Sequence, residues 1–178
     1  EGLWKEKNTF SLRLLKYQES EGEDLYRRGM YTFIKRGSPP PSLITFDATS
    51  REICTIKREK TSSPLQSLIL LNDTQFFEAS RVFAQRIFSE SQNDLDQQIK
   101  YGFRLATSRF PKKSEISLIK ELYQNQLDYY RKNKSEAYKI LNIGNSKKIK
   151  TRKSVDKIAA MTMVANTLLN LNESYYKY

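Results

Sequence analysis

The segment 155–171 constrains the fold most, because apolar residues cover nearly all of its sides. Its core, residues 158–171, reads IAAMTMVANTLLNL and contains no charged residue, glycine or proline. A helix that is apolar all round has to be surrounded by other elements. We therefore predict that this segment is the central helix of the fold.

Two amide side chains stand in this apolar setting. Asn166 and Asn170 lie four residues apart, so they share one face of the predicted helix. If they are buried they need hydrogen-bond partners. We expect those partners in the backbone of the segment 54–73 or in each other's helical turns.

Hydrophobic periodicity and capping signals predict further helices before the central one. At one of them, Ser63 supplies a capping hydroxyl and Pro64 suits the first helical position. The expected helices span residues 21–36, 64–71, 75–90, 94–107, 115–133 and 135–144. The fold class is therefore mainly α, a single-domain bundle of about six helices over residues 21–178 after an arm at 1–20.

Less regular segments carry their own expectations. In the extended arm, Trp4 is expected to pin the segment by packing, with ligand binding as the alternative. A proline-rich connector, SPPP at 38–41, follows the first helix. Residues 42–46 are predicted to be extended, and the terminal ESYYKY is expected to be exposed.

In the helix at 64–71, the predicted buried face is apolar. The residues expected to form it are Leu65, Leu68, Ile69 and Leu71. The helix at 75–90 carries a similar stripe of aromatic and aliphatic side chains. The residues expected to face its core are Phe76, Ala79, Ser80, Phe83 and Ile87.

The composition excludes several classes of site. The chain has 178 residues, no histidine and one cysteine, which rules out Ser-His-Asp triads, histidine zinc sites and disulfide scaffolds. No apolar run is long enough to suggest a spanning helix. The first residues, EGLWKEKNTF, do not resemble a signal peptide. We expect the sequence to be one module of a longer protein.

The formal net charge of +11 bears on partners rather than on fold. Such a surface attracts nucleic acid, acidic polysaccharide or anionic lipid, and it is also typical of a plain solvated surface. The loop 145–153, NSKKIKTRK, has the same two interpretations. It lacks the interleaved aromatic residues on which bases stack, which disfavours single-strand binding.

The stretch 51–73 gathers the candidate functional residues. It joins a basic loop to a helix start and contains the only cysteine, and Asp47 lies just before it. The candidates of this corner are Asp47, Arg51, Cys54, Lys57, Arg58, Lys60, Gln66 and Asn72.

Each candidate in the corner has a functional and a structural interpretation. Cys54 beside basic residues is either a reactive thiol or a small buried hydrophobe. The basic residues either cradle a phosphate, sulfate or carboxylate at the helix start or pair with internal carboxylates. Asp47 either takes part in acid–base chemistry or caps a turn.

A series of motifs runs through most of the chain in a fixed order. They are Arg27-Arg28, Tyr31 with Phe33, Phe46-Asp47-Ala48, Arg51-x-x-Cys54, Lys57-Arg58-x-Lys60-Thr61, Ser63-Pro64-Leu65-Gln66, Leu70 to Asp73, Phe103-Arg104-Leu105, Arg109-x-Pro111 and Thr162 to Leu171. The start Glu1 to Trp4 fits the same series. With these motifs the chain resembles the C-terminal domain of unknown function of planctomycete-type cytochrome c proteins.

The departures from the family pattern are few. Lysines stand at 57 and 60 and serine at 63, where the family has arginines and threonine. Thr162 follows Met161, where a tryptophan is common, and Lys112 takes a helix-cap position. Lysine matters at 57 and 60 if those groups bind a planar anion through two prongs.

The resemblance implies a bacterial, exported protein of several modules, located in the periplasm, on the cell surface or outside the cell. A c-type haem would belong to a separate domain, and no cofactor or metal is expected in this one, which lacks Cys-x-x-Cys-His. The expected partners are other domains of the same longer chain, with anionic polysaccharide as a further partner.

Two functional hypotheses follow, with a third disfavoured. The first is a non-catalytic binding or structural module. The second is a hydrolase-like or redox-linked enzyme domain acting on polysaccharide through Asp47, Arg51, Cys54 and Arg58. Nucleic-acid binding rests only on the net charge, and export counts against it.

Overall fold

The computed structural model describes residues 22–32, 34, 39–50, 53–91, 94–146 and 154–176. Within these residues it contains eight α-helices and two short 3-10 helices, and no strand. The prediction of a mainly α fold is confirmed. The chain divides into two compact units, Glu1–Gln66 and Ser67–Tyr178. That both units form one domain stays a prediction, and the arm at 1–20 lies outside the described residues.

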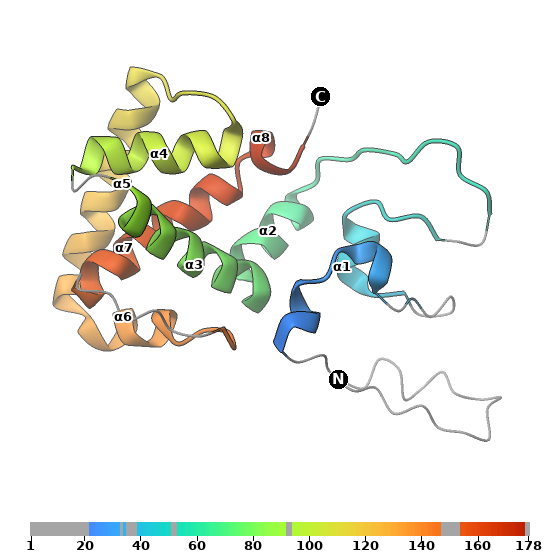
Figure 1. Cartoon of the computed structure of the whole chain (residues 1–178), viewed down its shortest axis with the longest axis horizontal. Helices are drawn as coiled ribbons and strands as arrows, with labels where there is room; N and C mark the ends of the chain where they lie inside the picture. Colours follow the sequence, from blue (N-terminus) through green and yellow to red (C-terminus); the bar gives the residue numbers. More distant parts are fainter. Residues whose placement is uncertain are drawn as a thin grey trace. The chain divides into compact units, whose positions relative to one another are not determined.

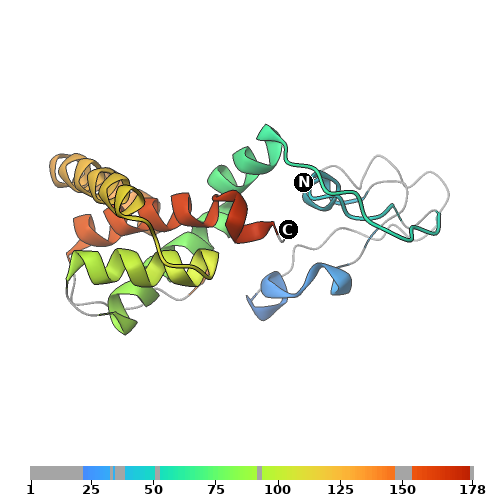
Figure 2. The same cartoon turned by 90° about the horizontal axis from the view of Figure 1, so that it is seen from above.

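The second unit is a helical bundle. Its helices are α3 (Thr74–Glu90), α4 (Leu95–Thr107), α5 (Lys113–Lys132), α6 (Lys134–Leu141), α7 (Val155–Leu169) and α8 (Asn172–Tyr175). Helix α7 runs through the middle of this bundle and packs against α3, α4, α5 and α6 (Figures 1 and 2). The buried residues of α7 lie on several sides of the helix, and Asn166 is one of them. The predicted central helix is confirmed.

Side-chain caps fix where the bundle helices begin. The Asp73 carboxylate accepts hydrogen bonds from the N–H groups of Gln75 and Phe76 at the start of α3. Asp94 accepts one from the N–H of Gln97 at the start of α4. Because these N–H groups have no partner inside the helix, a carboxylate at this position stabilises the first turn. The sequence predicted both starts.

The inner face of α3 differs from the prediction. Its buried residues include four polar ones, and Ala79 is exposed instead of facing the core. The buried residues are Glu78, Ser80, Arg81, Ala84, Gln85 and Ile87. A prediction from apolar residues alone places the buried face of α3 too far toward its aromatic side chains, because it leaves out the polar residues that are buried. The expectation for Ala79 is wrong, and Ser80 and Ile87 are buried as expected.

In the first unit, the predicted helix at 21–36 is replaced by two 3-10 turns, η1 (Gly22–Tyr26) and η2 (Gly29–Tyr31). Gly22 has a φ of 61°, and Gly29 interrupts the segment. Glycine inside a helix is unfavourable because it gives up the most backbone freedom. Met30, in the second of these turns, is exposed.

Residues 42–45 are helical rather than extended and Phe46 follows in a turn, which corrects the prediction for residues 42–46. Helix α1 spans Pro41–Thr45, and Pro41 occupies its first position. Pro41 is the last of three consecutive prolines, and it favours a helix start because its fixed φ suits a helix. The Thr45 hydroxyl donates to Pro41 O at 2.9 Å and closes this single turn.

Helix α2 (Pro64–Asn72) begins at Pro64, as predicted, and crosses the boundary between the two units. Its predicted buried face is wrong. Leu65, Leu68 and Leu71 are exposed, whereas Gln66 and Leu70, one turn apart on another face, are buried. The hydrogen bonds of Gln66 hold its side chain in the interior, and this orientation of the helix leaves the three leucines exposed.

The C-terminal residues also depart from the prediction. Residues 172–175 of the tail form α8, and Ser174 and Tyr175 are half-buried. The Ser174 hydroxyl donates to Leu168 O at 2.6 Å, which ties this turn to the end of α7. Among the described residues, no helix is long and apolar enough to cross a membrane.

Candidate functional site

Asp47 occupies a tight turn after α1. Its φ of 58° lies in the left-handed region, which Asp tolerates better than most residues. The carboxylate accepts the Thr61 N–H at 2.8 Å and the Thr61 hydroxyl at 2.8 Å. These hydrogen bonds, first from the backbone and then from the hydroxyl, lower the pKa of Asp47. At neutral pH the side chain is an acceptor and has no proton to give.

Arg58 closes the same turn from outside. Its Nε donates to Asp47 O and its Nη2 to Phe46 O, both at 3.0 Å. One edge of the guanidinium therefore grips two successive carbonyls of the chain. This edge is the one that would bind a carboxylate or phosphate in two-pronged fashion, and here the protein's own backbone occupies it.

Gln66 completes the arrangement from inside. Its side chain is 1% exposed. Nε2 donates to Thr45 O at 2.8 Å and to Thr61 Oγ1 at 3.1 Å, and Oε1 accepts from Ser63 N at 3.2 Å. Ser63 Oγ in turn accepts from Gln66 N at 3.4 Å. This reciprocal pairing is a capping box, which starts α2 and joins it to α1.

We call Asp47, Arg58, Thr61 and Gln66 the Asp47 latch. The structure thus brings together three of the eight corner candidates. The fourth member, Thr61, appeared in the sequence only as part of a motif. The signal that identifies the latch is the spacing Ser-x-x-Gln directly after a basic run. Its geometry holds α1, the loop and α2 together, and every group in it is used for that purpose.

Four other corner candidates lie among the described residues. Cys54 is an exposed free thiol, so its interpretation as a buried hydrophobe is wrong. Lys57 and Lys60 are exposed, and Lys60 takes part in an interaction with another group. Asn72 Nδ2 donates to Leu68 O at 2.9 Å, within α2. Arg51 lies outside the described residues.

The two asparagines of α7 behave differently from each other. Asn166 is buried and donates to Leu70 O at 3.5 Å and to Ser80 Oγ at 3.3 Å. Leu70 lies in the segment 54–73, where the sequence predicted a backbone partner for this side chain. Asn170 is only half-buried, and it forms the end of α7 through its backbone N–H, which donates to Asn166 O at 3.1 Å.

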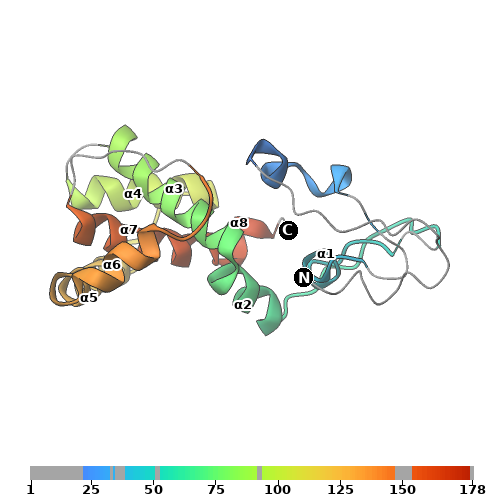
Figure 3. The same cartoon turned by 90° about the horizontal axis from the view of Figure 1, so that it is seen from below.

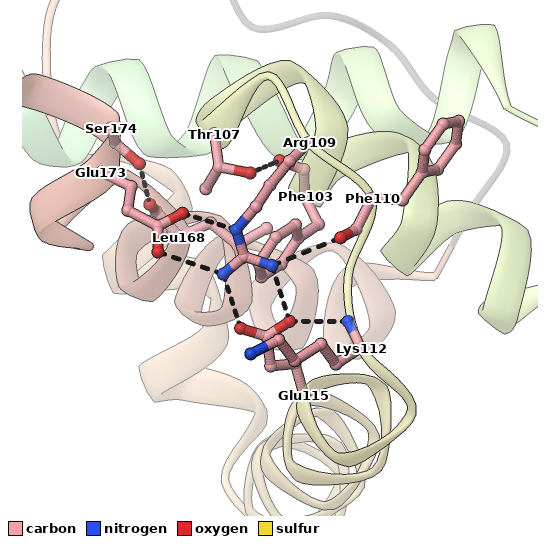
Figure 4. A network of polar contacts seen from close by, with 9 residues as sticks. All are labelled: Phe103, Thr107, Arg109, Phe110, Lys112, Glu115, Leu168, Glu173 and Ser174. Carbon is pink, nitrogen blue, oxygen red and sulfur yellow. Dashed lines mark hydrogen bonds and ion pairs between the residues drawn. The ribbon is translucent and has the colours of Figure 1, made fainter. Parts of the chain in front are cut away.

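A second polar cluster, missed by the sequence analysis, centres on Arg109 between α4 and α5 (Figure 4). Its guanidinium pairs with Glu115 of α5 at 2.6 Å and with Glu173 of α8 at 2.7 Å. It also lies over the Phe103 ring, with Cζ 4.8 Å from the centroid. We call Arg109, Glu115 and Glu173 the Arg109 brace, because they connect three helices.

Charge pairing in this brace keeps both carboxylates ionised. Hydrogen bonds from Arg109, and next from the Lys112 N–H, lower the pKa of Glu115 to about 2. Arg109 likewise lowers the pKa of Glu173. Two carboxylates with lowered pKa values and one shared cation give no acid–base pair, since neither can act as the acid. The brace therefore supports the fold.

Metal ligands do not gather in the part of the chain that the structure describes. No group of three or more Cys, Asp or Glu side chains there lies in a position to hold a metal ion.

Comparison with known proteins gives one match. A family model described as PSD1, protein of unknown function (DUF1553), matches residues 5–123. The matched range contains both the Asp47 latch and helices α2 to α4, and it ends within α5. No curated protein and no solved structure matches the chain.

Proposed function

The chain belongs to the PSD1 family of proteins of unknown function (DUF1553), and we propose that it is a non-catalytic module that docks against a neighbouring domain of a longer protein. The predicted membership in a family of unknown function is confirmed. Export and association with c-type cytochromes, which the sequence motifs suggest, are part of this proposal.

The observation that carries the proposal is the apolar surface of the first unit. Seven of its large hydrophobic side chains are more than half exposed, and among its described residues only Gln66 is buried. The exposed side chains are Tyr26, Met30, Tyr31, Ile44, Ile53, Ile56 and Leu65. A concentration of exposed apolar side chains in one unit is typical of an interaction site.

The Asp47 latch supports docking over catalysis. Asp47 and Arg58, two of the residues proposed for an enzyme site, direct their polar groups at the chain itself. Ile53 and Ile56 lie in the loop whose end the latch holds. Fixing a loop before binding lowers the entropy lost on association. The latch therefore holds a loop whose exposed side chains are apolar, and its own polar groups bind the chain instead of taking part in a reaction.

The size of this surface favours a domain of the same chain as the partner. Interfaces between free proteins bury roughly 1,200–2,000 Å², whereas contacts between domains of one chain need only about 600–1,500 Å². A tether raises the effective concentration of the partner domain. Seven exposed side chains are well below the roughly 20–30 residues that each partner contributes to an interface between free proteins, so we assign the docking partner to an apolar surface on a neighbouring domain.

Binding between separately produced parts tests the proposal. The chain of 178 residues is titrated calorimetrically with the other domains of its natural longer protein. Ile56→Asp, at a fully exposed position, should weaken binding about tenfold or more, because it places a charge in an apolar contact. Its melting temperature should stay that of the wild type.

Leu118→Asp is the matched control, since Leu118 is an exposed leucine on α5 of the second unit. It should leave the affinity unchanged. Equal losses in both variants would show that the apolar surface of the first unit is not the docking surface. Turnover of a polysaccharide by the chain, abolished by Asp47→Asn, would favour the enzyme hypothesis instead.

A further inference from the structure

One face of α3 buries three polar side chains in the interior of the bundle. Glu78, Arg81 and Gln85 are 4%, 1% and 8% exposed. They follow one another at intervals of three and four residues, so they lie along a single stripe of the helix. The chain after α6 contacts this stripe through hydrogen bonds from Asn145 and Ser146 to Glu78, and the helices α3 and α6 are labelled in Figure 3.

Glu78 is engaged by that loop. Its Oε2 accepts the Asn145 N–H and its Oε1 accepts the Ser146 N–H, both at 2.8 Å. Gly144, with a φ of 86°, directs these two N–H groups toward the carboxylate. A side chain at Gly144 would overlap with Glu78, so the loop and the helix are in close contact here.

Arg81 is only partly satisfied in the same place. Its Nη2 donates to the Ser146 hydroxyl and, at 3.5 Å, to Ser146 O. Glu78 Oε1 is 4.0 Å away, the outer limit of an ion pair. Nε and Nη1 are buried and have no hydrogen-bond partner among the described residues, and the same is true of Gln85 Oε1 one turn further along.

Hydrogen-bond donors of Arg81 and a hydrogen-bond acceptor of Gln85 therefore lie on the same stripe of α3 without partners among the described residues. Arg81 offers N–H donors and a charge that a guanidinium does not give up, and Gln85 offers an acceptor. Leaving such groups unpaired in the interior is costly, and native proteins almost always satisfy them. A single occupant that accepts from Arg81 and donates to Gln85 would satisfy both.

We infer that this stripe is a binding site for a protonated oxyanion of the hydrogen phosphate type, with Arg81 as its anchor. Hydrogen phosphate carries negative oxygens for the guanidinium and a P–OH group for Gln85. Sulfate and carboxylates accept hydrogen bonds only, so they satisfy Arg81 and leave Gln85 unpaired. The site is independent of the docking surface, which lies in the other unit.

Nitrogen spectra of the arginine Nε–H groups test the inference in the intact chain. Inorganic phosphate is added to the labelled protein at constant ionic strength, with chloride as the balancing anion. The Arg81 signal should move and saturate with phosphate, and sulfate should need at least about tenfold higher concentration for the same shift. Gln85→Leu should weaken phosphate binding about tenfold and remove the preference over sulfate.

Arg86→Lys provides the matched control, because Arg86 is an exposed arginine on the same helix that pairs with Glu90 at 3.0 Å. It should leave phosphate binding intact, whereas Arg81→Lys should abolish it. The wild-type titration and Gln85→Leu decide the matter if Arg81→Lys does not fold. An Arg81 signal that stays unmoved by phosphate, or that chloride moves equally, would mean that buried water satisfies these groups and would overturn the inference.

Discussion

Gly144 is the residue whose replacement tests the packing of the loop on α3 most directly. Gly144→Ala forces a side chain into a left-handed φ of 86° and into the space of the Glu78 carboxylate. We expect a loss of about 2–4 kcal/mol in the free energy of unfolding, measured by urea denaturation. The loss combines backbone strain with the displacement of a buried charge from its two N–H donors.

Gly22→Ala separates the two contributions. Gly22 also has a positive φ, of 61°, but no atom lies within 4 Å of the position that a Cβ would take. Only the strain remains, about 1 kcal/mol. A Gly144→Ala variant no less stable than Gly22→Ala would contradict the close contact between the loop and Glu78.

Sequence reasoning located some of these residues and missed others for physical reasons. The predicted helix at 135–144 placed its end at Gly144, although α6 ends earlier, at Leu141. Glu78 and Arg81 gave no signal, because charged residues are assigned to the surface by default. Their partners are backbone groups more than 60 residues away in the chain, and no local pattern encodes such a contact.

Among the helices, the start of α2 offers a test of the Asp47 latch. Gln66→Leu removes the hydrogen bonds to Thr45 O, Thr61 Oγ1 and Ser63 N while keeping the side chain's bulk. We expect a loss of about 2–3 kcal/mol in local stability, since buried partners are left unpaired. Hydrogen exchange of the Thr61 N–H should accelerate, because the latch that protects it opens.

Gln124→Leu is the control for that change. Gln124 is exposed on α5, and its Nε2 donates to Asp128 at 3.1 Å. Its loss should leave exchange at Thr61 unaltered. Unaltered exchange in Gln66→Leu as well would mean that Arg58 and Asp47 hold the turn without Gln66.

Helix length decided how well the elements could be predicted. Helices α3, α4, α5 and α7 span three turns or more, so their apolar residues repeat often enough to define a face. Helix α1 and the two 3-10 turns contain five residues or fewer. At that length, proline and glycine placement decides the conformation, and periodicity carries no information.

For the molecule as a whole, acid should weaken the Arg109 brace. The pKa of Glu115 is about 2 in the folded chain and returns to about 4.5 on unfolding. Because the folded value is the lower one, the stabilisation is complete above pH 4.5 and disappears as pH falls toward 2. Calorimetry should show a melting temperature about 2–4 °C above that of Glu115→Gln at pH 6, and no difference at pH 2.

Glu121→Gln serves as the control for the charge change, since Glu121 is exposed on the same helix. Its melting temperature should follow that of the wild type across this range. A gap between the wild type and Glu115→Gln that stays constant down to pH 2 would show that the brace acts without ionisation of Glu115.

Helix α7 is the common partner of α3, α4, α5 and α6, yet it follows all of them in the chain. On the ribosome, the apolar faces of the earlier helices therefore emerge before the helix that covers them. At about 5–20 residues per second, the 81 residues from Thr74 to Ser154 take roughly 4–16 s to synthesise. Through that interval the helix that completes the core is missing, so the apolar faces of the earlier helices stay exposed and chaperones are expected to bind the nascent chain. A stop codon anywhere before α7 would leave a product that aggregates instead of a smaller folded bundle.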